Sequence, residues 1–276
     1  MRFGLETEQH HLGFDDLVHR ARMAEELGLD GVWVCDHFLP LIGDPKGPNL
    51  EAWTALAGLA RETTRIRLGT MVTGMTHRWP SVLAAQVLTV DQLSGGRVEC
   101  AVGAAWNEAE HRAYGIPFPS VRERMDGLEE GVQILRRLFT EDDVTFEGRR
   151  YSLDAATLHP RPVQRPHPPI WVGGTGRTRT LPIAGRYADV WHGWADDAAE
   201  YREIRGIIDD AAGAAGRDPA SILRASSLSI EEPWDEVRAA FDWMAAEGIG
   251  YLMLEWPASG EARVRSFVAD VLPGLA

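Results

Sequence analysis

One pattern recurs along this chain: a short apolar or β-branched run, then a longer segment with the apolar spacing of an amphipathic helix. The runs lie at residues 2–6, 31–36, 66–72, 97–103, 169–174, 188–193, 222–230 and 251–256. Strands that alternate with helices pair in parallel, because right-handed crossovers return the chain to the same end of the sheet. Eight such units can close on themselves. The pattern therefore predicts a (β/α)8 barrel, with an open doubly wound sheet as the alternative.

The segments between these runs have helical spacing. It is clearest at residues 14–27, where apolar residues recur every three or four positions and Gly28 follows as a stop signal. Residues 122–139 have the same spacing, and so does a last segment, 264–272, which ends at Pro273-Gly274. An α/β barrel of this length commonly forms one domain, so we expect residues 1–276 to be a single domain.

Residues 144–169 break the alternation. They hold two β-like runs around a Glu147-Gly148-Arg149 turn, and then five prolines. This predicts a β-hairpin followed by an extended proline-rich connector, inserted before the fifth barrel strand.

Composition narrows the class of protein. A net charge of −13 without a basic cluster argues against a nucleic-acid partner. The two cysteines, Cys35 and Cys100, lie in predicted strands, and the N-terminus has no apolar leader. No apolar run is long enough to span a bilayer. We therefore expect a cytoplasmic protein that contacts neither nucleic acid nor membrane and that acts on a small molecule.

Barrel enzymes place their active sites at the carboxyl ends of the strands. In this chain those ends are rich in carboxylates, amides, imidazoles and aromatic rings. The polar and aromatic candidates are Glu6, Glu8, Asp36, His37, Thr73, Thr76, His77, Trp106, Asn107, Glu108, Glu110, residues 173–178, His192, Trp194, Glu255 and Trp256.

Asp36 and His37 end the second predicted strand. Successive strand residues point to opposite faces, so at most one of them faces the barrel axis. In the functional interpretation, His37 exchanges a proton and Asp36 either orients the His37 ring or contacts the ligand. In the alternative, Asp36 only caps a helix or forms a hydrogen bond within the loop, and His37 has no catalytic role. We expect no metal, because adjacent side chains rarely share one ion, and His192 and Glu255 would have to complete such a site.

Two further strand ends suit a cofactor. Residues 173–178, Gly-Gly-Thr-Gly-Arg-Thr, precede a helix, so free N–H groups with Arg177 or Arg179 could bind a phosphate; the alternative is a tight turn that needs glycine. Small residues at 103–105 suit a flat ligand, with Trp106 and Asn107 beside it. The alternatives are core packing for Trp106 and, for Asn107, a helix N-cap with Glu110 as its capping partner.

Four stretches in this order resemble the bacterial luciferase-like family of flavin and deazaflavin barrel enzymes, and most of all its branch that uses the deazaflavin coenzyme F420. They are "GLDGVWVCDHFLP", the segment from "TTRIRLGTMVTGMTH" to "AAWNEAEHRAYGI", "RPVQRPHPPIWVGG" and "FVADVLPGL". Together they span nearly the whole chain.

The resemblance implies roles for particular residues. Asp36 and His37 would lie at the deazaflavin ring, with His37 as the proton-handling residue. Met71 and Val72 fall where the family places a non-prolyl cis peptide bond, in a bulge that supports the ring. The other implied cofactor-binding residues are Thr73, Gly103, Ala104 and Asn107 near the ring, and Gly174, Gly176, Arg177 and Thr178 toward the phosphate.

The resemblance has departures that bear on the substrate. The family's deazaflavin-dependent glucose-6-phosphate dehydrogenases have a tryptophan shortly after Asp-His and a glutamate after the fourth strand, where this chain aligns Leu41 and Trp106. We therefore expect a neutral or apolar substrate rather than a sugar phosphate. The residues expected to contact it are Phe38, Leu41, Trp79, Trp106 and Trp194.

The predicted activity is hydride transfer between coenzyme F420 and this substrate, in a protein that the family implies is a homodimer. The first alternative is an FMN-dependent monooxygenase of the same family, which uses reduced flavin and O2. A flavin-binding protein without catalysis is the second, and a metal-dependent hydrolase is the most distant.

Overall fold

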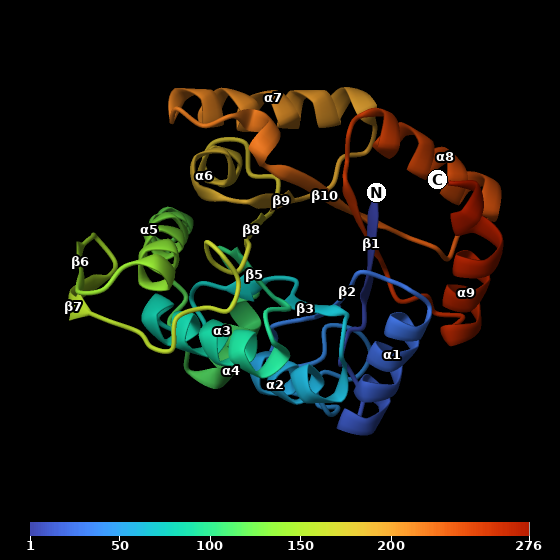
Figure 1. Cartoon of the computed structure of the whole chain (residues 1–276), viewed down its shortest axis with the longest axis horizontal. Helices are drawn as coiled ribbons and strands as arrows, with labels where there is room; N and C mark the ends of the chain where they lie inside the picture. Colours follow the sequence, from blue (N-terminus) through green and yellow to red (C-terminus); the bar gives the residue numbers. More distant parts are fainter. Residues whose placement is uncertain (276) are drawn as a thin grey trace.

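A closed parallel sheet forms the centre of the molecule. The computed structural model describes residues 1–275, and within them the strand order is β3-β2-β1-β11-β10-β9-β8-β5, closed by pairing of β3 with β5. Figure 1 shows these strands around a central axis with the helices outside, which confirms the predicted (β/α)8 barrel. The sheet strands are β1 (Arg2–Glu6), β2 (Gly31–Val34), β3 (Arg67–Thr70), β4 (Thr73–Gly74), β5 (Val98–Gly103), β8 (Ile170–Gly173), β9 (Val190–His192), β10 (Leu223–Leu228) and β11 (Tyr251–Leu254).

β3 and β4 are two parts of one barrel strand. β3 pairs with the first part of β5 and β4 pairs with its last part. Between them lies a cis peptide bond joining Met71 and Val72, at the position that the family resemblance implied. Each predicted strand is confirmed, and several end one or two residues earlier than predicted because the chain turns into its loop.

Helices cover the outside of the barrel. α1 begins after Gly13 and is followed by Gly28, whose φ of +83° suits the turn back into the sheet. The helices are α1 (Phe14–Glu26), α2 (Ala52–Glu62), α3 (Pro80–Ser94), α4 (Glu108–Tyr114), α5 (Val121–Thr140), α6 (Thr180–Tyr187), α7 (Ala198–Ala214), α8 (Trp234–Ala246) and α9 (Glu261–Ser266). α9 continues as a π turn, Phe267–Val271, and a 3-10 turn, Leu272–Gly274, over the segment predicted as the last helix.

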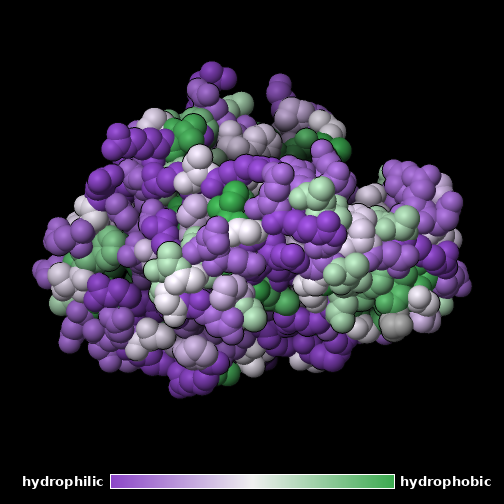
Figure 2. Space-filling model, turned by 90° about the horizontal axis from the view of Figure 1, so that it is seen from above, coloured by the Kyte–Doolittle hydropathy of each residue, from purple (hydrophilic) through white to green (hydrophobic). Residues whose placement is uncertain are grey.

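The outer surface is mainly hydrophilic in the view of Figure 2, with hydrophobic patches scattered between charged side chains. Among the described residues, no helix combines the length and the apolar character that a bilayer span requires.

The predicted hairpin insertion is present. β6 (Val144–Glu147) pairs antiparallel with β7 (Ser152–Ala156), beside α5 at the left of Figure 1. The Glu130 carboxylate of α5 accepts hydrogen bonds from the backbone N–H groups of Arg149, Arg150 and Tyr151, at 2.7, 2.9 and 3.0 Å. Tyr151 then donates from its hydroxyl to the carbonyl of Met75, 3.2 Å away. These bonds hold the insertion against the barrel mouth.

Aromatic side chains fill the barrel interior. Trp33 donates its indole N–H to the hydroxyl of Tyr251 at 3.1 Å, and Trp171 donates to the Glu99 carboxylate at 2.7 Å. These rings pack edge to face, with Trp33 and Trp171 centroids 4.5 Å apart. Gly69 leaves room for the Trp33 ring, which a Cβ at this position would overlap. The interior is therefore packed, and a ligand can enter only from the mouth.

Replacing Gly69 by Ala should destabilise the fold by about 1–3 kcal/mol, because the added methyl group overpacks the barrel interior. The free energy of unfolding, from urea denaturation, measures this. Gly206→Ala is the matched control: Gly206 lies inside α7 with nothing within 4 Å of an added Cβ, so alanine should stabilise by up to about 1 kcal/mol. Equal effects of the two substitutions would contradict the described interior.

Candidate active site

A cavity of about 370 Å³ opens at the carboxyl ends of the barrel strands. This is the edge where the sequence analysis expected the site, and the volume is in the usual range for small-molecule sites. Many of the predicted site residues line it, namely His37, Met71, Val72, Gly103, Ala104, Trp106, Asn107, Gly174, Gly176 and Trp194. It is also lined by five residues named among the strand-end candidates, His77, Ala105, Gly173, Thr175 and His192, and by two that were not named, Gly74 and Thr180.

Val72 and two glycines shape one wall of the cavity. A Cβ on Gly103 or on Gly173 would come within 2.8 Å of the Val72 side chain, so both positions need glycine for this close approach. Met71 and Val72 also pack against the aromatic cluster of the barrel interior. The result is a firm apolar wall of small residues, which suits a flat ring.

His37 is held by a carboxylate. Its Nδ1 lies 2.8 Å from Oε2 of Glu110, and Oε1 of Glu110 accepts from the backbone N–H of Phe38 at 2.5 Å. Burial would raise the pKa of Glu110, but these two hydrogen bonds outweigh it and lower the pKa. The ionised Glu110 keeps a proton on Nδ1 of His37, which leaves Nε2 as the nitrogen that can exchange a proton with a ligand.

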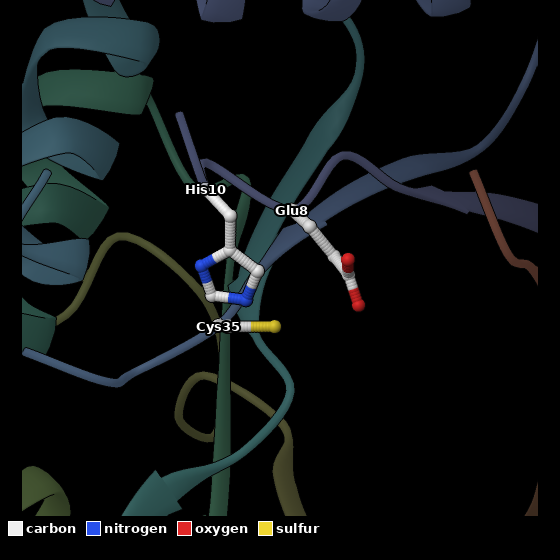
Figure 3. A group of neighbouring side chains, drawn as sticks. All are labelled: Glu8, His10 and Cys35. Atoms are coloured by element: carbon white, nitrogen blue, oxygen red, sulfur yellow. The ribbon is translucent and has the colours of Figure 1, made fainter. Parts of the chain in front are cut away.

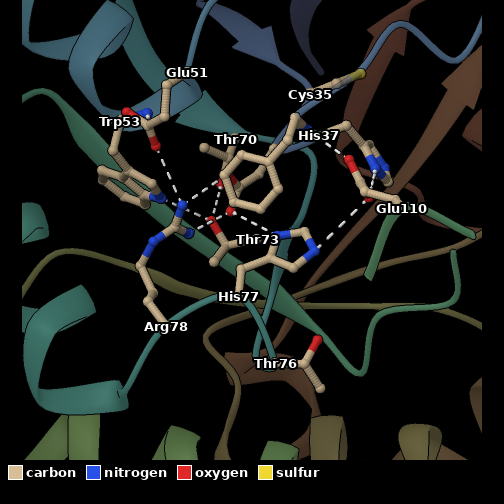
Figure 4. Close-up of polar contacts among 12 residues, drawn as sticks. Cys35, His37, Glu51, Trp53, Thr70, Thr73, Thr76, His77, Arg78 and Glu110 are labelled. Carbon is tan, nitrogen blue, oxygen red and sulfur yellow. Dashed lines mark hydrogen bonds and ion pairs between the residues drawn. The ribbon is translucent and has the colours of Figure 1, made fainter. Parts of the chain in front are cut away.

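Glu110, one of the strand-end candidates, was considered as the capping partner of Asn107 and was given no role beside His37. Asn107 does cap α4, since its side chain accepts from the Glu110 N–H at 3.1 Å, as expected. The Glu110 side chain, however, does not complete the capping box; it turns to His37, which Figure 4 shows with their connecting bond. The contact between Glu110 and His37 forms because α4 packs against the end of β2 in the folded chain, and no spacing in the sequence indicates it.

His77 lies between two carboxylates at the cavity. Its Nδ1 is 3.7 Å from Asp36 and its Nε2 is 4.0 Å from Glu110, the latter contact being visible in Figure 4. Both nitrogens are buried and lack a hydrogen-bond partner among residues 1–275. A buried imidazole without partners is one that a ligand or a water can still bond.

Asp36, which was predicted to be a catalytic and cofactor-binding residue, is not among the residues that line the cavity. It forms a paired contact with Arg78, with N–O distances of 2.5 and 3.0 Å, and Arg78 also reaches Glu51 at 3.2 Å. Burial alone would raise the pKa of Asp36, but nearby His77 and Arg78 hold it well below its usual range. Because adjacent residues point in opposite directions, His37 faces the mouth and Asp36 faces the surrounding helices.

Other predicted contacts also lie outside the cavity lining. Thr73 is buried and accepts from the Trp53 indole N–H at 2.9 Å, so its hydroxyl serves packing against α2 (Figure 4). Phe38 packs on His77 with ring centroids 5.0 Å apart, behind the lining. Trp79 lies against Tyr151 of the hairpin insertion, in a separate hollow. Leu41 is an exposed residue of the loop after β2.

The glycine-rich loop after β8 borders the cavity, but its arginine points elsewhere. Arg177 pairs with Glu203 at 2.7 Å and Glu200 at 3.4 Å on α7, so it is already neutralised. Gly176 and Thr180 are shared with a second hollow of about 470 Å³, which Thr178 also lines. Three arginines line that hollow, Arg122, Arg124 and Arg179. Two of these three arginines, Arg122 and Arg124, come from α5, which the spacing of the sequence did not indicate.

A hydrogen-bonded chain leads from the cavity into the barrel. His192 lies 3.2 Å from the Ser227 hydroxyl, which donates to Glu6 at 3.0 Å. Burial lowers the pKa of His192 to about 4, so its ring is neutral. Burial raises the pKa of Glu6 to about 7, Ser227 opposes this, and the nearby acids Glu255 and Glu8 add to it. A carboxyl group that titrates near neutral pH thus lies two hydrogen bonds from the cavity.

Comparison with known proteins gives a family. A family model described as luciferase-like monooxygenase matches residues 1–265. The chain therefore belongs to the luciferase-like monooxygenase family, as the resemblance of its sequence motifs implied.

Two curated relatives are named as F420-dependent enzymes. An F420-dependent glucose-6-phosphate dehydrogenase of Amycolatopsis mediterranei is 35% identical over 190 residues, 68% of this chain and 54% of that protein. An F420-dependent hydroxymycolic acid dehydrogenase of Mycobacterium tuberculosis is 32% identical over 239 residues, 85% of this chain and 64% of that protein. This chain thus spans between about half and two thirds of their length.

A solved structure has the same fold. An F420-dependent secondary alcohol dehydrogenase in complex with an F420-acetone adduct superposes with a TM-score of 0.88 at 22% identity, covering 100% of this chain and 99% of that one. The superposition confirms the barrel over its full length.

Replacing Asp36 by Asn should destabilise the fold by about 3–5 kcal/mol at pH 7, because buried Arg78 then loses its closer and buried carboxylate and keeps only the partly exposed Glu51. The pKa of Asp36 is lower in the folded than in the unfolded chain, so the ion pair stabilises above about pH 4 and less as the pH falls further. Urea denaturation at pH 7 and pH 3 should therefore show a difference from wild type that shrinks in acid. The exposed Asp154→Asn control should stay within about 0.5 kcal/mol of wild type. A difference that persists unchanged at pH 3 would rule out this account.

Proposed function

We propose that this protein is a coenzyme F420-dependent oxidoreductase that moves a hydride between the deazaflavin and a small, neutral organic substrate, most simply an alcohol. The observation that carries the proposal is the cavity itself, where a firm apolar wall at Val72 lies beside an imidazole, His37, whose Nδ1 is hydrogen-bonded to Glu110. The names of the two curated relatives, both deazaflavin-dependent dehydrogenases, support it.

The residues present fit this cofactor. Val72, Gly103 and Ala104 would hold the flat ring, since an added Cβ on Gly103 would reach Val72. The adjoining hollow would hold the phosphate at Arg122 and Arg124, by charge complementarity, whereas Arg179 beside them is already paired with Asp126 and Glu129. When bound, the deazaflavin supplies the hydride acceptor or donor.

His37 would exchange the substrate's proton. In alcohol oxidation Nε2 of His37 would take the hydroxyl proton, and the Glu110 carboxylate at Nδ1 would stabilise the resulting imidazolium. In the reverse direction the same nitrogen would give the proton back. The low pKa of Glu110 suits this role, because the carboxylate then stays charged through the whole cycle.

The lining of the cavity favours a neutral substrate. It includes neither Lys nor Arg among the described residues, so a substrate phosphate would have no counter-charge there. Trp106 and Trp194 line it while 66% and 61% exposed, and exposed aromatic rings at a cavity rim are typical of apolar ligand contacts. This agrees with the substrate expected from the departures at Leu41 and Trp106.

A binding titration tests the cofactor. The protein, made in a host without deazaflavin, should bind F420 tightly and FMN weakly, followed by fluorescence. Arg122 forms no ion pair among residues 1–275, so Arg122→Gln should weaken F420 binding about tenfold. The same substitution should leave unchanged the affinity for a deazaflavin riboside that lacks the phosphate. Tight FMN binding with rapid substrate-dependent O2 uptake would instead support the monooxygenase alternative.

Kinetics test the role of His37. With F420 and a panel of secondary alcohols, His37→Ala should lower kcat by about 10²–10⁴-fold, the usual contribution of a general base. The dissociation constant for F420 should change only a few-fold. Glu110→Gln should give a smaller loss of kcat, because Nε2 remains while its support is weakened. Parallel losses of kcat and of cofactor affinity in His37→Ala would mean that His37 only binds.

A further inference from the structure

Outside the cavity lining, three side chains of different chemistry converge at the ends of β1 and β2. Ligand atoms of Glu8, His10 and Cys35 all lie within 4.8 Å of one another. Figure 3 shows the three side chains directed toward a common space, Glu8 and His10 from the loop after β1 and Cys35 from the residue after β2. None of them lines the 370 Å³ cavity.

His10 has one ring nitrogen without a partner. The residue is only 8% exposed, and its Nε2 is buried with no hydrogen bond to any described residue. In Figure 3 this nitrogen is on the side of the ring that faces Cys35. An unpaired buried nitrogen of this kind is uncommon, because its desolvation is not compensated.

Asn49 determines which nitrogen of His10 carries the proton. Its side-chain amide donates to the carbonyl of His37 at 2.6 Å, so its oxygen faces His10 and accepts from Nδ1 at 2.9 Å. The neutral ring then keeps a lone pair on Nε2. Histidines that bind metals are held in the same way, with the other ring N–H donated to an oxygen.

The side chain of Gln9 forms hydrogen bonds with the backbone of Cys35. Its side-chain oxygen accepts from the Cys35 N–H at 2.9 Å, and its amide nitrogen donates to the Cys35 carbonyl. Gln9 is fully buried and lies between Glu8 and His10 in the sequence, so these two hydrogen bonds tie the backbone of the loop after β1 to the backbone of Cys35.

The charge around the cluster suits a divalent cation. Glu8 forms no ion pair within residues 1–275, so its carboxylate is available to a cation. The sulfur, imidazole and carboxylate set is the one that Zn²⁺ binds in proteins. It would leave a fourth position of a tetrahedral site for water.

We propose that Glu8, His10 and Cys35 form a Zn²⁺ site, with Nε2 of His10, the sulfur of Cys35 and a carboxylate oxygen of Glu8 as ligands. Binding would release the thiol proton of Cys35 to solvent and form the zinc–thiolate bond. Sulfur and nitrogen bound at about 2.3 and 2.1 Å lie roughly 3.5 Å apart in a tetrahedron, so the ligands must approach by about 1 Å. The half-exposed Glu8 has the freedom to do so.

Such a site would tie the loop after β1 to the chain that leads to the active site. Cys35 is two residues before His37, and Asn49 bonds both His10 and the His37 carbonyl. The metal would act as a structural clamp beside the proposed cofactor site. The inference uses none of the residues proposed to bind cofactor or substrate, so either proposal can fail alone.

Co²⁺ is the probe, because it replaces Zn²⁺ and reports thiolate ligation through a sulfur-to-metal charge-transfer band. Metal-free reduced protein titrated with Co²⁺ should develop this band with one ion per chain. Cys35→Ala should abolish it, whereas Cys100→Ala should keep it, since Cys100 is buried in β5. Glu8→Gln should weaken Co²⁺ binding about tenfold or more, and Zn²⁺ should raise the Tm of wild type and Cys100→Ala only.

Absence of the band in wild type, or its persistence in Cys35→Ala, would overturn the proposal. The spectrum also separates this site from a second cluster, His77, Glu110 and His111, because that one has no sulfur. Both ring nitrogens of His111 are already bonded at 2.7 Å, to Asn107 and Thr76. Circular dichroism of each variant shows whether a lost band reflects a lost ligand or a lost fold, and Glu8→Gln keeps the test valid if Cys35→Ala does not fold.

Discussion

The interruption of one barrel strand at Met71–Val72 is the constraint on which the cavity depends. The closed sheet needs β3 and β4 to pair with successive parts of β5, and the chain between them carries Val72 against the backbone of its neighbours. Only glycine at positions 103 and 173 allows that approach. The wall of the proposed ring site is thus a product of sheet geometry, made of backbone and small side chains that do not rearrange easily.

The architecture could be predicted from the sequence because its signals are local. β-rich runs, helical spacing and stop residues such as Gly28 depend on neighbours a few positions away, and they located every barrel strand and the hairpin insertion. Strand ends also indicated the correct edge of the barrel, because parallel strands bring their carboxyl ends together. Most residues that line the cavity come from these ends.

The partners of individual side chains could not be predicted in this way. The alternation rule said that only one of Asp36 and His37 faces inward, but not that Arg78 would pair with Asp36. Arg177 was expected at a phosphate and instead pairs with Glu203, which comes from the next helix of the barrel. Glu110 was considered as a capping partner in its own helix and instead reaches His37 at the end of another strand. Each of these contacts joins segments distant in sequence, so no local pattern encodes it.

Of the four buried carboxylates among the described residues, two are neutralised by arginines away from the cavity. Asp36 is paired with Arg78, and Glu99 with Arg67 and the Trp171 indole. Pairing these two acids away from the cavity keeps their charge out of the cavity walls while each buried acid stays hydrogen-bonded. The space left for a ligand is therefore mostly apolar, with imidazole and amide groups as its polar features.

The packed interior also bears on the order in which ligands can bind. Trp33, Trp171 and Tyr251 close the barrel below the cavity, so ligands have one opening for entry and exit. A molecule seated against Val72 has to arrive before, and depart after, any molecule that covers it. With the cofactor proposed to lie against Val72 and the substrate above it, the blocked floor would make binding ordered, so that the cofactor binds before the substrate and leaves after the product.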